Sequence, residues 1–161
     1  MQKPYTLRDY LHFLQLYRRN QQRQRKWGRE YETAVRDGSF KLPAATVVQL
    51  IPTEACNLRC PFCNQWGENG YFLRGVRHAT HMDEPSLVRL MQSLSPRDSL
   101  ISVHGGEPFA YKHTPTLLEL LLEQQFDVMF STNGTLLTPH LKHLAQIRNL
   151  GFLLSIDGDE E

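Results

Sequence analysis

Short apolar runs alternate with helical segments from residue 46 onward, and this alternation limits the possible folds more than any other feature of the chain. Four runs have the length of a buried parallel strand, at 46–51, 99–103, 127–131 and 152–156. Helical patterns lie between them at 84–94, 116–125 and 139–149, the last opened by Thr138 as N-cap and Pro139. The spacing suits right-handed βα units. We therefore predict an α/β fold with about four parallel strands, either part of a barrel or an open doubly wound sheet.

The N-terminal segment differs from the rest of the chain in charge and periodicity. Residues 1–45 carry ten Lys or Arg against four Asp or Glu, whereas residues 46–161 carry eight against thirteen. Apolar residues recur at helical spacing, at Leu7, Tyr10, Leu11, Leu14 and Tyr17. We predict a basic N-terminal helical extension over 1–45, with a helix from Thr6 to about Trp27, followed by the α/β part over 46–161. Its basic run at 18–26 is either a solvated helix end or an arm that docks an acidic partner, a peptide or a nucleic acid.

Composition places the chain among ordinary globular proteins. It is 40% hydrophobic and 22% charged, and no apolar run approaches the eighteen or so residues that span a bilayer. The N-terminus does not resemble a secretion signal. We expect a cytoplasmic protein with reduced thiols, no membrane association and no general affinity for nucleic acid.

The three cysteines of the chain fall in one short run. Cys56, Cys60 and Cys63 form a C-x3-C-x2-C triplet. Three thiolates on one loop can bind three irons of a [4Fe-4S] cluster and leave the fourth iron without a protein ligand. Zinc is an alternative if His78 or His81 supplies a fourth ligand, but structural zinc sites usually pair two ligand doublets across a longer gap. An odd number of cysteines disfavours a disulfide framework.

A polar or glycine-rich segment follows each predicted strand. The first strand leads to the cysteine loop, the second to residues 104–108, the third to 132–135 and the fourth to 157–158. Ligands of α/β folds bind at the carboxyl ends of the strands, so these segments should share one rim. Gly105 and Gly106 lack a Cβ and let the backbone approach a ligand, while Glu107 offers an acceptor for an ammonium group.

Two of these segments resemble the signatures of the radical S-adenosylmethionine (SAM) enzymes. One is the cysteine triplet with the aromatic Phe62 before its last cysteine, and the other is the run Gly105-Gly106-Glu107-Pro108. The resemblance implies a partial TIM-type barrel and a [4Fe-4S] cluster that binds SAM through its methionine amino and carboxylate groups. It also implies reductive cleavage of SAM to a 5′-deoxyadenosyl radical that abstracts hydrogen, sensitivity to oxygen, and an electron donor such as flavodoxin or ferredoxin.

The resemblance assigns roles to further residues. Gly105, Gly106 and Glu107 would hold the amino group of SAM, and Phe62 would lie against the adenine or shield the cluster from water. Polar positions at the ends of the third and fourth strands would bind the SAM carboxylate and ribose, namely Ser131, Asn133, Ser155 and Asp157. We assign no catalytic role to a side chain, including the seven histidines.

The chain also departs from the family. Radical SAM cores generally have six βα units, whereas four strands are predicted here, so strand 152–156 becomes an open edge. We expect a truncated core: a piece of a longer enzyme, or one part of a split enzyme whose edge is covered by a partner chain or by self-association. Loop 64–72 loosely resembles members with a cysteine-rich auxiliary-cluster domain, and with the basic N-terminal segment it suggests a peptide substrate.

Two other functions are compatible with the sequence. One is a non-catalytic iron–sulfur or SAM-binding fragment that acts only with a partner chain. The other is a zinc-binding interaction module that uses the basic arm. The cysteine triplet is common to all three hypotheses, so metal content and SAM turnover distinguish them.

Overall fold

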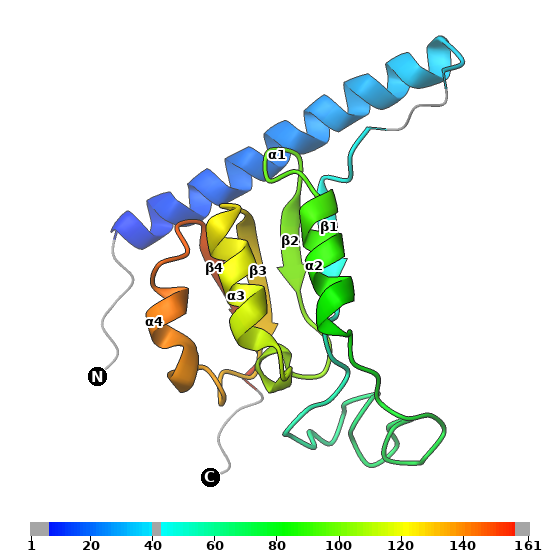
Figure 1. Ribbon diagram of the computed structural model, residues 1–161, viewed down its shortest axis with the longest axis vertical. Helices are drawn as coiled ribbons and strands as arrows, with labels where there is room; N and C mark the ends of the chain where they lie inside the picture. Colours follow the sequence, from blue (N-terminus) through cyan, green and yellow to red (C-terminus); the bar gives the residue numbers. More distant parts are fainter. Residues whose placement is uncertain (1–6, 40–42, 157–161) are drawn as a thin grey trace.

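The computed structural model describes residues 7–39 and 43–156 as an α/β arrangement (Figure 1). In chain order its elements are α1 (Leu7–Arg36), β1 (Val47–Leu50), α2 (Glu84–Ser93), β2 (Leu100–Val103), a 3-10 turn (Pro108–Ala110), α3 (Thr114–Glu123), β3 (Asp127–Thr132), a second 3-10 turn (Thr138–His140), α4 (Leu141–Leu144) and β4 (Leu150–Leu154). The strands form one parallel sheet in the order β1-β2-β3-β4. The predicted fold class is confirmed.

The hydrophobic core lies between the sheet and the helices α2 and α3 that cover one of its faces (Figure 1). The buried strand residues are Leu50, Ile101, Val103, Val128 and Phe130, and the helices contribute Leu87, Met91, Leu117 and Leu121. Each such side chain contributes about 1.5–3 kcal/mol by leaving water. Residues that alternate with them, such as the aligned Gln49, Ser102 and Met129, are exposed or half-buried. One face of the sheet therefore carries the core, and the other remains accessible among the described residues.

The ends of α2 and α3 follow from local chemistry. Asp83 caps α2, because its carboxylate accepts a hydrogen bond from the Ser86 backbone N–H at 2.8 Å. The α3 helix begins at Thr114, two residues before the predicted start, and ends at Glu123 rather than Gln125. Gln125 has a φ of 57°, a left-handed conformation that ends a helix.

The segment from 138 to 154 differs from its prediction. The expected helix over 139–149 is only a 3-10 turn followed by the four residues of α4, and no side chain caps the turn, so the N-cap role of Thr138 was wrong. β4 begins two residues earlier than predicted. The reason is its register, because Val128 of β3 pairs with Leu150 and donates a backbone hydrogen bond to the carbonyl of Asn149 at 2.8 Å.

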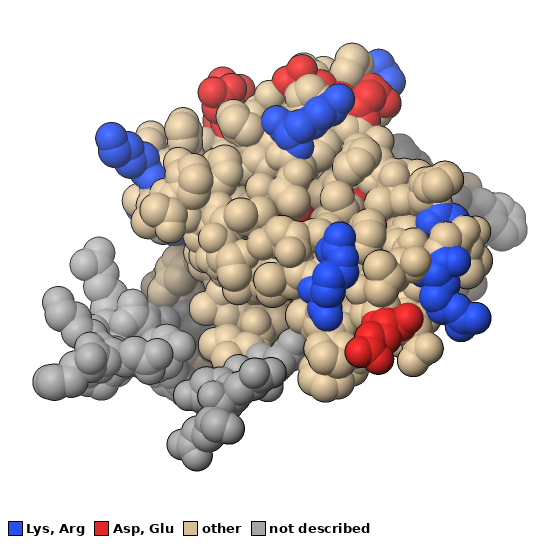
Figure 2. All heavy atoms as spheres, turned by 90° about the horizontal axis from the view of Figure 1, so that it is seen from below, with Lys and Arg blue, Asp and Glu red and all other residues tan. Residues whose placement is uncertain are grey.

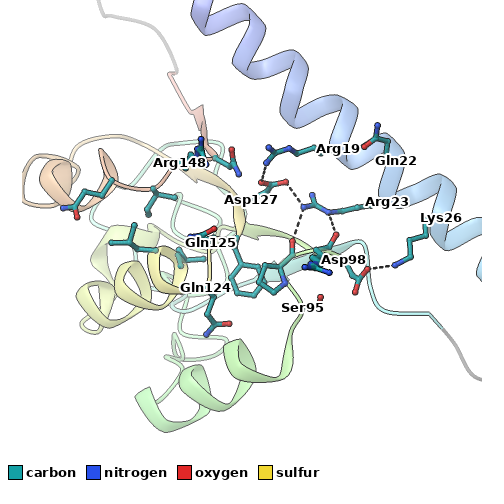
Figure 3. Close-up of a pocket in the computed structure, with 18 residues that line it drawn as sticks. Arg19, Gln22, Arg23, Lys26, Ser95, Asp98, Gln124, Gln125, Asp127 and Arg148 are labelled. Carbon is teal, nitrogen blue, oxygen red and sulfur yellow. Dashed lines mark hydrogen bonds and ion pairs between the residues drawn. The ribbon is translucent and has the colours of Figure 1, made fainter.

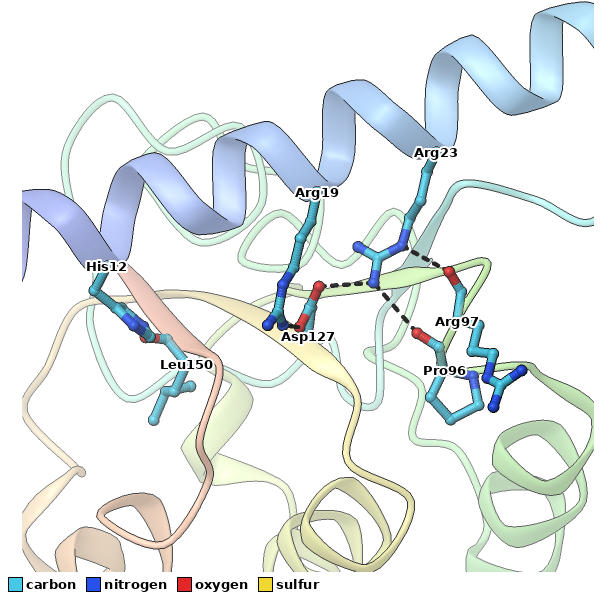
Figure 4. A network of polar contacts seen from close by, with 7 residues as sticks. All are labelled: His12, Arg19, Arg23, Pro96, Arg97, Asp127 and Leu150. Carbon is cyan, nitrogen blue, oxygen red and sulfur yellow. Dashed lines mark hydrogen bonds and ion pairs between the residues drawn. The ribbon is translucent and has the colours of Figure 1, made fainter.

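Helix α1 crosses the amino ends of the strands (Figure 1), and part of its basic run holds it there (Figure 4). Arg19 Nη1 lies 3.0 Å from Asp127 Oδ1, and Arg23 Nη2 lies 2.7 Å from Asp127 Oδ2. Arg23 also donates to the backbone carbonyls of Pro96 and Arg97, both at 3.2 Å. The helix is longer than predicted, and neither of the two expected roles of its basic run describes these intramolecular contacts.

The long helix α1 is polar. None of the helices in the described parts of the chain is both long and apolar enough to cross a membrane.

Candidate cofactor-binding site

Backbone hydrogen bonds join the Gly-Gly-Glu run to the segment that enters the cysteine loop. The N–H of Gly106 donates to the carbonyl of Thr53 at 3.1 Å, and that of Glu107 donates to the carbonyl of Ala55 at 2.8 Å. A Cβ on Gly106 would lie 2.2 Å from the Ala55 oxygen, and one on Gly105 would lie 2.3 Å from the Thr53 oxygen. Gly105 also has a φ of 139°. The two glycines are therefore required for this close approach of backbone to backbone.

The carboxylate of Glu107 is fully buried and connects the ends of β2 and β3. Its Oε1 accepts hydrogen bonds from the Thr132 hydroxyl at 2.7 Å and from the Phe109 N–H at 3.1 Å. Its Oε2 accepts one from the Asn133 N–H at 2.9 Å. Because each carboxylate oxygen has two lone pairs, Oε2 keeps room for one more donor.

Asn133 links this carboxylate to the cysteine loop. Its side-chain nitrogen lies 3.9 Å from Cys56 Sγ and 3.1 Å from Asn57 Oδ1, while its backbone N–H binds Glu107. Asn57 in turn donates to the Thr135 hydroxyl at 2.8 Å. Three of the four segments predicted to share a rim are thus in contact at the carboxyl edge of the sheet.

The cysteine loop holds its sulfur atoms with backbone groups. The N–H of Leu58 donates to Cys56 Sγ at 3.4 Å, and the N–H of Trp66 donates to Cys63 Sγ at 3.3 Å. All three cysteines are half-buried. Hydrogen bonds to sulfur stabilise negative charge on thiolates, and they are one of the ways in which proteins set the reduction potential of an iron–sulfur cluster.

The arrangement of possible ligands does not form a site for one ion. In residues 7–39 and 43–156, no three Cys, His, Asp or Glu side chains lie close enough to hold a single metal. Zinc needs its thiolates about 2.3 Å from one centre, so the Cys3His site considered above is not formed. The thiolates of a [4Fe-4S] cluster bind separate irons and lie farther apart. Three thiolates on one loop are a donor set that can bind three separate irons of such a cluster.

A buried histidine nitrogen lies beside the glycines. His104 immediately precedes Gly105 and keeps β2 in register through a 3.0 Å bond from its N–H to the Leu50 carbonyl. Its Nε2 is buried and has no hydrogen-bond partner in the described part of the chain. A buried unpaired polar atom costs about 1–3 kcal/mol. An atom of this kind fits a site that receives a hydrogen-bonding ligand.

The loop that follows the cysteines is tied back to the strand before them. The Trp66 indole N–H donates to the Glu54 carbonyl at 2.8 Å. The Glu54 carboxylate accepts from the hydroxyl of Thr80 at 2.6 Å and pairs with Arg77. The Thr80 hydroxyl bond, more than the nearby Arg77 charge, holds the pKa of Glu54 below its usual range. Arg77 also lies over the Tyr71 ring, 5.1 Å from its centroid. These contacts give a long loop a fixed path.

Four residues that were predicted to contact the cofactors do not take part in the hydrogen bonds described above. Phe62 is 74% exposed, so it contacts solvent rather than shielding the cysteines. Ser131 is half-buried on β3. Ser155 is exposed, and its N–H donates to the Thr132 carbonyl at 3.0 Å, which places it beside the end of β3. Asp157 lies outside the described residues. The roles of these four in binding SAM stay predictions.

Thr132 was not among the predicted site residues. Period-two alternation places it on the same side of β3 as Val128 and Phe130, so its hydroxyl had to be buried. A buried hydroxyl needs a partner, and here it donates to Glu107 and accepts from the Gly134 N–H at 3.0 Å. The period-two alternation of β3 could therefore have predicted that the Thr132 hydroxyl is buried and hydrogen-bonded.

Viewed from below, at the carboxyl edge, the molecule presents mainly uncharged side chains (Figure 2). Lys and Arg are interspersed with Asp and Glu, and the described atoms on this face form no broad patch of one sign. Recognition at this edge therefore depends on short-range hydrogen bonds more than on a long-range field.

A parallel α/β sheet whose carboxyl edge joins a cysteine triplet to a Gly-Gly-Glu run defines a cofactor-dependent enzyme core. Residues 50–161 match the model of the radical SAM superfamily, which is more than half of the chain. The chain belongs to this superfamily of enzymes, and the expected resemblance is confirmed.

Relatives with assigned activities cover only part of the chain. It is 32% identical to 7-carboxy-7-deazaguanine synthase of Aquifex aeolicus over 60% of its own length and 40% of the synthase. It is 30% identical to the probable GTP 3′,8-cyclase of Methanococcus maripaludis over 57% of its length and 30% of the cyclase. The chain thus spans less than half the length of either relative.

Solved structures of SuiB from Streptococcus suis share the fold. SuiB bound to its precursor peptide SuiA matches with a TM-score of 0.60 and 21% identity, over 80% of this chain and 28% of SuiB. SuiB bound to S-adenosylmethionine matches with a TM-score of 0.58 and 19% identity, over 82% of this chain and 28% of SuiB. The shared architecture is that of a partial TIM-type barrel.

Proposed function

We propose that the chain binds a [4Fe-4S] cluster through Cys56, Cys60 and Cys63 and binds SAM beside it. The observation that carries this proposal is the position of Asn133, which contacts both the Cys56 sulfur and the Glu107 carboxylate. The two signatures of the superfamily are therefore neighbours in space. When bound, the cluster supplies the electron that cleaves SAM to a 5′-deoxyadenosyl radical for hydrogen abstraction.

The residues of the chain would position SAM rather than react with it. Glu107 Oε2 has one acceptor position left for the methionine ammonium group, and Gly105 and Gly106 hold this residue against the segment that enters the cysteine loop. The amide of Asn133 suits the SAM carboxylate. Ser131, Ser155 and Asp157 are polar positions for that carboxylate and the ribose, and the exposed ring of Phe62 is free to lie against the adenine.

The substrate we propose is a peptide, and the electron donor is a flavodoxin or a ferredoxin. The fold shared with SuiB, whose structure contains a precursor peptide, supports the peptide. We retain the division into a basic extension over 1–45 and a radical SAM core over 46–161. Remaining βα units would come from further chain, from a partner chain or from self-association at β4.

Anaerobic reconstitution with iron and sulfide tests the cofactor assignment. We expect a brown protein with about four irons per chain and a cluster EPR signal that SAM alters. Cys60→Ser should reduce the iron content, whereas His81→Ala should leave it unchanged. A colourless, iron-free wild-type product, or zinc that is lost in the His81 variant, would overturn the proposal.

A second function is favoured by the small share of the relatives that the chain spans. It is a cluster- or SAM-binding part that acts only with a partner chain. The reconstituted chain would then yield no 5′-deoxyadenosine after dithionite reduction until another polypeptide is added. Turnover by the isolated chain excludes this second function.

A further inference from the structure

A groove of about 920 Å³ lies at the amino edge of the sheet, at the opposite ends of the strands from the cysteine loop (Figure 3). Helix α1 forms one wall, and the segments that precede β2, β3 and β4 form the other. Its charged lining includes Arg19, Arg23 and Lys26 from α1 and Asp98, Asp127 and Arg148 from the opposite wall. The volume is within the range of specific ligand sites.

We propose that this groove binds an acidic peptide segment and so holds the substrate at a distance from the cofactors. The assignment of the peptide as substrate rests on the proposed function, whereas binding itself does not. Nothing in the cofactor site depends on the groove, because the two lie at opposite ends of the same strands.

The charge of the groove favours a carboxylate-bearing ligand. Five basic and two acidic side chains line it, and both acids are already paired with cations of α1. Arg148 has no acidic partner within 4.0 Å among the described residues. The Arg23 side chain is only 10% exposed, and its Nη1 is buried without a partner there. The groove therefore retains positive charge and an unused guanidinium donor.

The neutral lining favours a peptide over a nucleotide. Gln22, Gln124, Gln146 and Asn149 offer side-chain amides, which donate and accept hydrogen bonds as a peptide backbone does, whereas phosphates only accept. Phe126 is the aromatic residue of the lining, and it is 1% exposed, so its ring offers no face on which a base can stack. Both features match an extended peptide.

Helix geometry sets the spacing that such a peptide must match. Arg19 and Lys26 are seven residues apart, or about 10 Å along the helix axis. An extended peptide covers that distance in about three residues, and because its side chains alternate between two faces, acidic residues two or four apart would face these two cations together. The six residues of β3 span about 20 Å. A peptide held in the groove therefore needs roughly six further residues to reach the cysteine loop, which separates its recognition segment from its reacting residue.

Fluorescence anisotropy with two labelled octapeptides tests the proposal on the full chain, purified without cluster or SAM. One probe alternates Glu with Leu, and the other alternates Gln with Leu. We expect the acidic probe to bind and salt to weaken it. Arg148→Glu should weaken binding at least about tenfold, which corresponds to about 1.4 kcal/mol. Gln22→Glu should weaken binding in the same direction.

Gln24→Glu is the matched control for Gln22→Glu. Both side chains are exposed on α1 and the charge change is the same, but Gln24 is outside the groove, so binding should be unchanged. Circular dichroism checks that each variant is folded. Equal binding of the two probes, no binding, an equal loss in the Gln24 variant, or displacement of the probe by GTP would overturn the proposal. A failure of cluster reconstitution would leave this assay unaffected.

Discussion

At the scale of single residues, the most constrained group is the carboxylate of Glu107. It is fully buried, and it accepts hydrogen bonds from two backbone N–H groups and one hydroxyl. A buried anion is tolerated only with such partners. The residue therefore joins β2 to β3 in addition to any contact with SAM, and its two roles should be separable by experiment.

We expect Glu107→Gln to lower the free energy of urea unfolding by roughly 1–3 kcal/mol. The amide NH2 that replaces one carboxylate oxygen would face the N–H and O–H donors that now bind that oxygen. Glu119→Gln, on the exposed surface of α3, is the control and should change it by less than about 0.5 kcal/mol. Equal stability of the two variants would show that the carboxylate does not hold the strand ends together.

At the scale of elements, α1 is fixed by charge rather than by a continuous apolar stripe. Asp127 is the first residue of β3 and its side chain is 3% exposed; it pairs with Arg23, whose side chain is 10% exposed, and with Arg19, whose side chain is 49% exposed. Arg23 also donates hydrogen bonds to the backbone carbonyls of Pro96 and Arg97, which precede β2. The helix thus orders the amino edge of the sheet and forms one wall of the groove.

Asp127→Asn should destabilise the protein by roughly 3 kcal/mol, since it leaves the buried Arg23 guanidinium without its counter-charge. The control is Glu30→Gln, which breaks an exposed pair with Lys26 at 3.7 Å and should cost less than about 1 kcal/mol. Urea unfolding followed by circular dichroism measures both. Similar losses in the two variants would mean that the Asp127 pair acts like an ordinary surface contact.

At the scale of the whole molecule, the sheet is unevenly covered. Phe152, Leu153, Leu154 and Ile156 are 40%, 63%, 50% and 79% exposed, although they lie in or directly beside β4. Parallel strands are normally covered on both faces, and an exposed apolar edge promotes association. The surface of β4 is therefore the region where another βα unit or another chain would add to the sheet.

Leu153→Lys should reduce self-association of the isolated 161-residue chain, because a charged side chain on an edge strand opposes pairing. Sedimentation velocity over a wide range of protein concentration measures this effect. Val76→Lys adds the same charge in place of an apolar side chain that is 72% exposed in the loop after the cysteines, and it should have no effect. An unchanged association of the Leu153 variant would assign the contact to another surface.

Much of this architecture could be predicted from the local order of apolar, polar and glycine residues. Apolar runs bounded by glycine and polar residues located β1, β2 and β3 to within a residue, because burial between strands and helices requires continuous apolar side chains. The cysteine spacing and the Gly-Gly-Glu run located the site for a similar reason, since cluster ligation and close backbone approach each demand particular residue types. The end of α3 and the register of β4 were less predictable, because the left-handed conformation of Gln125 decided the first and pairing with β3 decided the second.

Residue order alone therefore predicted the α/β class, a rim shared by four polar segments, three of which are in contact in the structure, and the candidate cluster ligands, since each depends on periodicity or on spacing within a short segment. Only the folded chain could show that Asn133 joins Cys56 to Glu107, that Thr132 supports that carboxylate and that the basic helix meets Asp127. These contacts join residues 25 to 108 positions apart. Such pairs are brought together by strand register and helix packing, which no local pattern encodes.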